Sequence, residues 1–234
     1  VLPDGTIDYT VALWEHMHRG VTAENNAYPL LASATREMAK APPSAADELP
    51  KDKRRNPDLG DNVQDWVRFH PWKASDYPLM AAWIKKDEPA LTLAEVASRK
   101  TRMCPPKPAP GTVQWKDSPP VIDFVTPLSA RAMERLELGD QQAAMNDAET
   151  MQRLASLMAG SDTSLGFFIT NQFESSIFRV ALIGARTGNI TQKRQWLAFV
   201  LSLPEDSMPP TDMDTAWRFE RLNEVMEILR GNAQ

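Results

Sequence analysis

The fold is decided by residues 128–203, LSARAMERLELGDQQAAMNDAETMQRLASLMAGSDTSLGFFITNQFESSIFRVALIGARTGNITQKRQWLAFVLSL, the longest run of the sequence without a proline. Two turn signals divide this run, Leu138-Gly139-Asp140-Gln141 and Thr187-Gly188-Asn189-Ile190. Glycine ends a helix at low cost because it accepts the left-handed conformation, and a neighbouring Asp or Asn can start the next turn. The sequence therefore predicts two helical hairpins in series.

Apolar residues recur at helical spacing on both sides of these turns. The stripe that follows the first turn has steps of three and four residues: Ala144, Ala148, Met151, Ala155 and Met158. Residues 167–185 are apolar on most sides, and a helix with so little polar surface is expected at the centre of the packing. Residues 191–203 are expected to return antiparallel to it.

Shorter helical patterns surround this run. They are expected at residues 8–19, 22–40, 75–86, 89–99, 121–138 and 211–231. Thr22 is expected to accept a hydrogen bond from the amide of Asn25, and Pro29 should kink its helix or mark an irregular first turn. Residues 66–72 form an aromatic, partly extended segment. Because no stretch alternates as a strand does, the predicted class is all-α.

Prolines mark the connections between these patterns. The 19 prolines, against only 10 glycines, crowd into a few connectors. Residues 41–60 are expected to form a solvated loop, and residues 103–120 a second, proline-rich loop. We expect one helical domain over residues 1–234, in which 103–120 is either a surface loop or a linker between sub-lobes 1–102 and 121–234.

Composition restricts the class of protein. The 42% hydrophobic and 24% charged residues are ordinary for a soluble globular protein. A net charge of −5 argues against a nucleic-acid partner, which needs a basic face. No window approaches the ~20 apolar residues of a membrane span. The single cysteine, Cys104, excludes an intramolecular disulfide and a multi-cysteine metal site.

Motifs of catalysis and metal binding are missing from the sequence. It contains no GxSxG, P-loop, GxGxxG or HExxH pattern. His16 and His18 are two positions apart, which places them on different faces of a helix. Cys104 follows Arg102 closely, so it is either an incidental thiol or one activated by the neighbouring cation. We expect no catalytic residue, no cofactor and no metal. A protein that is not an enzyme is favoured, and an enzyme stays open as the alternative.

A polar group marks the start of the second helical pattern. Glu24, Asn25 and Asn26 follow one another there. Residues of this kind cap helices and suit the positive end of the helix dipole. The group is therefore interpreted either as a cap or as a ligand-binding cluster.

Tryptophans gather in the middle third of the chain. Trp66, Trp72, Trp83 and Trp115 all lie beside charged residues. Such residues can form the core of a small, proline-interrupted lobe, or they can stack on sugars or peptide side chains if they are exposed. Both interpretations stay open at the level of the sequence.

The segment at 130–149, ARAMERLELGDQQAAMNDAE, resembles a hairpin of the tetratricopeptide type. Ala132 matches the small residue of the first helix, Gly139 and Asp140 match the turn, and Ala144 matches the start of the second helix. Ala148 stands where that family favours an aromatic residue, and about one repeat is covered. The resemblance implies antiparallel helices and a role in binding a protein or peptide.

The whole chain is also similar to an uncharacterised family of exported bacterial helical proteins. The shared segments are LPDGTIDY at 2–9, GVTAENNA at 20–27 and the hairpin at 136–147. The resemblance implies export but no activity. Because the sequence starts at Val1, we expect a hydrophobic signal or anchor upstream, and a location outside the cytoplasm or at the outer face of the cytoplasmic membrane.

Two functional hypotheses follow from the sequence. The favoured one is a non-enzymatic helical scaffold that binds a protein or peptide. The alternative is a binder or hydrolase of an extracellular polymer that uses the tryptophans together with nearby carboxylates such as Asp76, Asp87 and Glu88.

Overall fold

The computed structural model describes residues 11, 14–15, 18–39, 63–107, 120–159 and 164–203. Several predictions lie outside these residues: the segment 2–9, most of the helix at 8–19 with His16, the loop 41–60, Trp115 with most of the proline-rich loop, and the helix at 211–231.

The described residues form helices joined by turns. In chain order the helices are α2 (Tyr28–Glu37), α3 (Val63–Phe69), α4 (Pro78–Ser98), the 3-10 helix η2 (Pro120–Phe124), α5 (Val125–Glu137), α6 (Gln141–Ala159), α7 (Ser164–Thr187) and α8 (Ile190–Leu201). Within the described part of the chain, β structure is limited to one isolated bridge, between Asn26 and Arg102. The predicted all-α class is confirmed.

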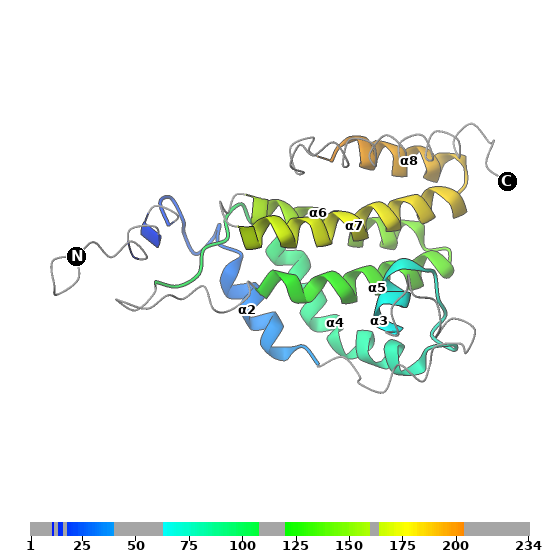
Figure 1. Cartoon of the computed structure of the whole chain (residues 1–234), viewed down its shortest axis with the longest axis horizontal. Helices are drawn as coiled ribbons and strands as arrows, with labels where there is room; N and C mark the ends of the chain where they lie inside the picture. The colour runs from blue at the N-terminus through cyan, green and yellow to red at the C-terminus, as the bar shows by residue number, and fades with distance from the viewer. Residues whose placement is uncertain are drawn as a thin grey trace.

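The predicted hairpins are α5–α6 and α7–α8. Helix α6 packs against both α5 and α7, α5 and α7 also contact each other, and α8 packs on α7. Figure 1 shows these four helices roughly along the long axis, with α8 outermost on one side and α2 and α4 on the other. The finer likeness to a tetratricopeptide repeat stays a prediction.

The glycines of the two turns act in different ways. Gly139 has φ +79°, the left-handed conformation expected at the end of α5. Gly188 is needed for a close approach instead, because a Cβ there would lie 2.9 Å from Cβ of Gln192 and 2.9 Å from the carbonyl oxygen of Gly184. Asn189 then starts α8 with a capping box: its side chain accepts from the Gln192 amide, and the Gln192 side chain accepts from its own.

The prediction of two helices at 75–86 and 89–99 is wrong. They form one continuous helix, α4, which contains Pro89. Proline removes the bond to the carbonyl of Lys85, but both residues are exposed, so water can reach that carbonyl. The buried face of Ile84, Leu91 and Ala94 continues across the proline and holds the helix together.

The N-terminal predictions also differ from the structure. Helix α2 begins at Tyr28 with Pro29 in its first turn, rather than at residue 22. Thr22 does accept from the Asn25 amide, at 3.3 Å, but it stabilises a separate turn. The segment at 66–72 begins as a helix, because Val63, Trp66 and Val67 bury one face of α3.

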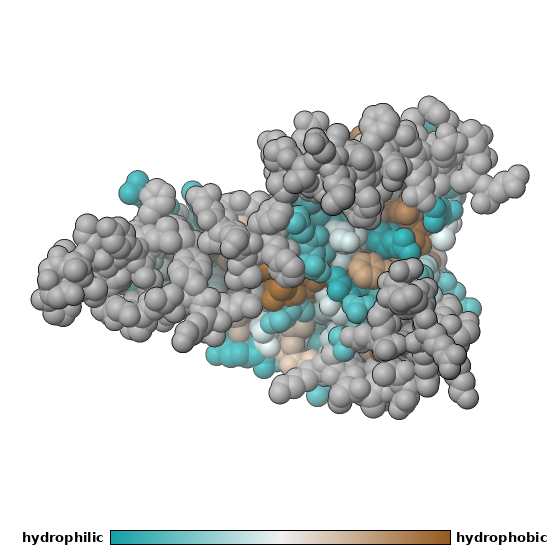
Figure 2. All heavy atoms as spheres, viewed as in Figure 1, coloured by the Kyte–Doolittle hydropathy of each residue, from teal (hydrophilic) through white to brown (hydrophobic). Residues whose placement is uncertain are grey.

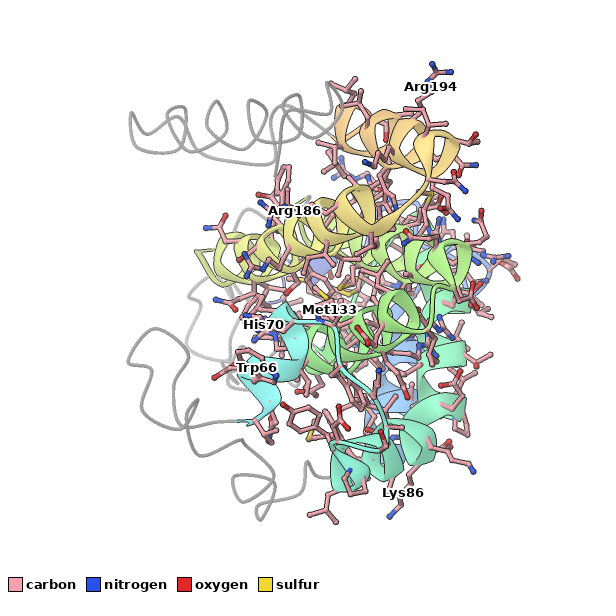
Figure 3. All side chains as sticks on the ribbon, turned by 90° about the vertical axis from the view of Figure 1, so that its right-hand side faces the viewer. Trp66, His70, Lys86, Met133, Arg186 and Arg194 are labelled. Carbon is pink, nitrogen blue, oxygen red and sulfur yellow. The ribbon has the colours of Figure 1, made fainter. Side chains whose placement is uncertain are left out.

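The core includes helices from both sides of the proline-rich loop. Helix α3 packs on α5 and α7, α4 packs on α5 and α6, and α2 packs on η2. Figure 3 shows Met133 of α5 inside the bundle, while Lys86 of α4 and Arg194 of α8 extend outward. None of the described helices combines the length and the hydrophobicity that a membrane span needs.

Candidate functional site

The group Glu24–Asn26 fastens the N-terminal turn to the end of α4. The side chain of Asn25 accepts from the Thr22 amide at 2.7 Å and donates to the carbonyl of Gly20 at 2.9 Å. Lys100 Nζ donates to the carbonyl of Glu24 at 2.6 Å. A hydrogen bond from the side chain of Thr22 lowers the pKa of the exposed Glu24 carboxyl. These contacts stabilise a turn ahead of α2, whose N-cap residue is Ala27 and has no side-chain cap bond. The ligand-binding interpretation of the group stays a hypothesis.

Asn26 fixes the backbone around the single cysteine. Its side chain donates to the carbonyl of Cys104 at 2.9 Å and accepts from the Cys104 amide at 3.0 Å. The Cys104 thiol is buried, and burial raises its pKa. Although Arg102 is close in sequence, the burial of the thiol therefore opposes formation of the reactive thiolate.

Trp72 and Trp83 are buried, and their indole nitrogens bond within the protein. Nε1 of Trp72 donates to the carbonyl of Ala130 in α5 at 2.8 Å. Nε1 of Trp83 donates to the carbonyl of Ala39, just beyond α2, at 3.0 Å. A buried indole usually satisfies its N–H in this way. The structure thus gives these two residues the core role rather than the exposed, stacking role.

Trp66 is also buried and stacks on His70, with ring centroids 3.6 Å apart and planes 5° apart. Figure 3 shows both side chains on α3 and the residues that follow it. In the same helix, Arg68 donates to Ser176 of α7 at 3.1 Å, and burial lowers the pKa of its guanidinium. The bond from Arg68 to Ser176 attaches α3 to the second hairpin.

A group of charges that is buried at Asp147 and Arg131 joins α4, α5 and α6. Asp147 of α6 is 2% exposed and accepts from Arg131 at 2.6 Å and from Arg135 at 2.7 Å. Arg131 also contacts Glu88 of α4 at 2.8 Å. Burial lowers the pKa of Arg131, but Asp147 and Glu88 raise it by more. Sequence reasoning missed this group; its signal was Arg131 and Arg135 one helical turn apart on an otherwise apolar face.

A polar chain that is buried at Trp196 and Gln141 and exposed at Thr187 holds the two turns together. Nε1 of Trp196 donates to Oε1 of Gln141 at 2.8 Å, and Nε2 of Gln141 donates to Oγ1 of Thr187 at 2.9 Å. Thr187 in turn donates to the carbonyl of Ile183. The start of α6, the end of α7 and the middle of α8 therefore have fixed relative positions.

Helix α8 is apolar on two opposite sides. Its inner side buries Trp196 and Phe199. At about 3.6 residues per turn, the opposite side carries Ile190, Arg194, Leu197 and Leu201, which we name the outer stripe. Ile190 is 59% exposed and Leu201 is 64% exposed. Leu197 is half-buried and Arg194 exposed.

An exposed apolar stripe is unusual for a helix at the surface. Solvent-facing positions of such a helix are normally polar. On the face in Figure 2 the described residues are mainly hydrophilic, with hydrophobic residues in small separate patches. The sequence contained the signal, apolar residues seven and four positions apart at 190, 197 and 201, but gave no means of telling the outer side from the inner one.

The remaining candidates from the sequence are dispersed. Asp76 is exposed and bonds to Ser75, Asp87 is buried against α2, and Glu88 belongs to the charged group described above. His18 stacks on Trp14. Across the described residues, no three His, Cys, Asp or Glu side chains come together in a way that could hold a metal ion.

Comparisons of this chain with protein-family models, with curated proteins and with solved structures found no match.

Proposed function

We propose that the protein is a helical scaffold that binds a protein partner through the outer stripe of α8. The observation that carries this proposal is the pair of large apolar side chains, Ile190 and Leu201, exposed opposite the buried side of the same helix. Covering them removes apolar surface from water, which favours association.

The chemistry of the stripe specifies the kind of partner. Ile190, Leu197 and Leu201, seven and four positions apart along one helix, can pack against the ridges of a second, amphipathic helix. Arg194 lies within the stripe, so an acidic side chain on the partner helix would pair with it. The polar chain through Gln141 and Trp196 holds α8 in place, so little ordering is required on binding.

Site-specific photo-crosslinking tests the proposal. A photoreactive residue at position 201 should crosslink one defined protein in cells of the source organism, and the same residue at the exposed Leu79 of α4 should not. Ile190→Glu should reduce that crosslink at least tenfold without changing the melting temperature. Leu79→Glu and Val96→Glu are matched controls on α4 and should leave it intact.

Two results contradict the proposal: the same set of proteins captured from positions 201 and 79, or an unchanged crosslink after Ile190→Glu. A crosslink between two copies of this chain would identify the partner as a second copy.

The polymer-binding alternative has less support. It requires exposed tryptophans, whereas Trp66, Trp72 and Trp83 are buried. Trp115 lies outside the described residues. The alternative therefore remains a hypothesis that no contact of the described residues favours.

A further inference from the structure

Asp87 and Trp83 together hold Ala39, the second residue beyond the end of α2. They lie one turn apart on α4. Asp87 accepts from the Ala39 amide at 2.7 Å, and Trp83 donates to the Ala39 carbonyl at 3.0 Å. Both polar groups of one residue are therefore bonded by side chains of a single helix. We name these three residues the Ala39 clamp.

The carboxyl of Asp87 has too few hydrogen-bond donors around it to be stable as an anion. It is 1% exposed, and only Oδ1 has a hydrogen bond. Its Oδ2 is buried without a hydrogen-bond partner among the described residues. A buried carboxylate needs several donors or a cation to offset its lost hydration. The neighbouring C-terminal end of α2 also carries a partial negative charge, which disfavours an anion there.

Charged groups on the surrounding helices do not supply the missing partner. They are Arg36 and Glu37 on α2; Lys85, Lys86, Glu88 and Glu95 on α4; Arg131, Glu134, Arg135 and Glu137 on α5; and Asp147, Glu149 and Arg153 on α6. The arginines of α5 pair with Glu88 and Asp147. Arg153 bonds to Ser98 and Glu149, and Arg36 to the carbonyl of Ala32. Lys86 is exposed.

We propose that the Ala39 clamp is a proton-controlled contact, closed while Asp87 is protonated and opening as the carboxyl loses its proton. Opening admits water to the carboxylate, which the closed contact excludes. The end of α2 is then attached to α4 more firmly at acidic pH than at neutral pH.

The direction in which the stability of the clamp changes with pH follows from the pKa of the Asp87 carboxyl. Burial raises it above the ordinary Asp value of 3.8, and the Ala39 amide and Lys86 oppose that shift without cancelling it. A group whose pKa is raised in the closed state stabilises that state fully below its ordinary pKa. The stabilisation is lost as pH rises through the raised value.

Hydrogen exchange of the Ala39 amide, expressed as a protection factor, measures the opening directly. Between the ordinary and the raised pKa, protection in the parent should fall by up to about tenfold per pH unit, because one proton is released on opening. In Asp87→Asn, which keeps the acceptor and cannot ionise, protection should not change with pH. Asp76→Asn removes an exposed carboxyl and should keep the slope of the parent.

The amide of Met151 in α6 is the internal reference, and its protection should not follow the Ala39 curve. If Asp87→Asn does not fold, the comparison of the Ala39 and Met151 amides in the parent still tests the proposal. Protection of Ala39 that is flat with pH in the parent, or that falls equally in Asp87→Asn, would overturn the proposal.

Discussion

At the residue scale, the contact between Gly184 and Trp196 fixes how closely α8 approaches α7. A Cβ on Gly184 would lie 2.3 Å from the indole ring. The ring cannot move away easily, because Nε1 of Trp196 is bonded to the buried Gln141. Glycine is required here for space rather than for backbone freedom.

Gly184→Ala should therefore lower the free energy of unfolding by about 1–3 kcal/mol, the usual cost of overpacking. Urea denaturation measures the change. In a Trp196→Leu background the same substitution should cost clearly less, since the smaller side chain leaves room. Equal costs in both backgrounds would show that the two residues do not interact.

The buried charges lead to a second prediction at this scale. Asp147→Asn removes the anion that two arginines share and should cost about 3–5 kcal/mol, because it leaves Arg131 buried with fewer partners. Glu149→Gln is the control: its partner Arg153 is part-exposed, so the cost should be about 0–1 kcal/mol. Thermal unfolding of both variants makes the comparison, and similar losses would contradict it.

At the scale of the element, α7 is a central helix of the bundle. It contacts α3, α5, α6 and α8. Its buried residues include Ile169, Phe173, Ile177 and Val180. A helix surrounded in this way cannot accept a charge on those positions.

Ile177→Asp should cost several kcal/mol, against a total stability of about 5–15 kcal/mol for an ordinary domain. The same substitution at the exposed Ile190 should change stability by less than about 0.5 kcal/mol. Melting curves for the two variants test the position of α7 directly. A variant at 177 that melts like the parent would show that this helix is not buried in solution.

Helical periodicity predicted the elements well where it was uninterrupted. The run at 128–203 contains no proline, and its helices and turns lie where the sequence places them. Around Pro89 the pattern failed, because tertiary packing on both sides of the residue outweighed its local effect on the helix. Glycine signals gave the turn positions but not the reason for each glycine: left-handed backbone at 139, close contact at 188.

The candidate site was less predictable than the fold. Residue type alone does not show which side of a helix meets solvent, so the outer stripe of α8 and the burial of Asp87 required the packing. For the same reason the sequence did not show whether the tryptophans of the middle third belong to the core or to the surface. For Trp72 and Trp83 the hydrogen bonds of their indole N–H groups within the protein gave the answer.

At the scale of the whole molecule, contacts cross the proline-rich loop at several points. They include the bond from Trp72 to Ala130 and the ion pair between Glu88 and Arg131. Two parts connected through a shared core unfold together rather than one after the other.

Denaturation in urea should therefore give one midpoint for far-UV circular dichroism and for tryptophan fluorescence. A variant that keeps Trp83 and one that keeps Trp196, with the other tryptophans replaced by phenylalanine, would report on the two parts separately. If these two probes gave different midpoints, the parts would be separate folding units.

The burial of Cys104 has a practical consequence for labelling. It is the one thiol in the sequence, it is 2% exposed, and Asn26 bonds to the backbone on both of its sides. An alkylating reagent can reach this sulfur only when the packing that buries Cys104 opens. In the unaltered protein, the rate of alkylation of Cys104, followed by mass spectrometry, therefore measures how often this region opens.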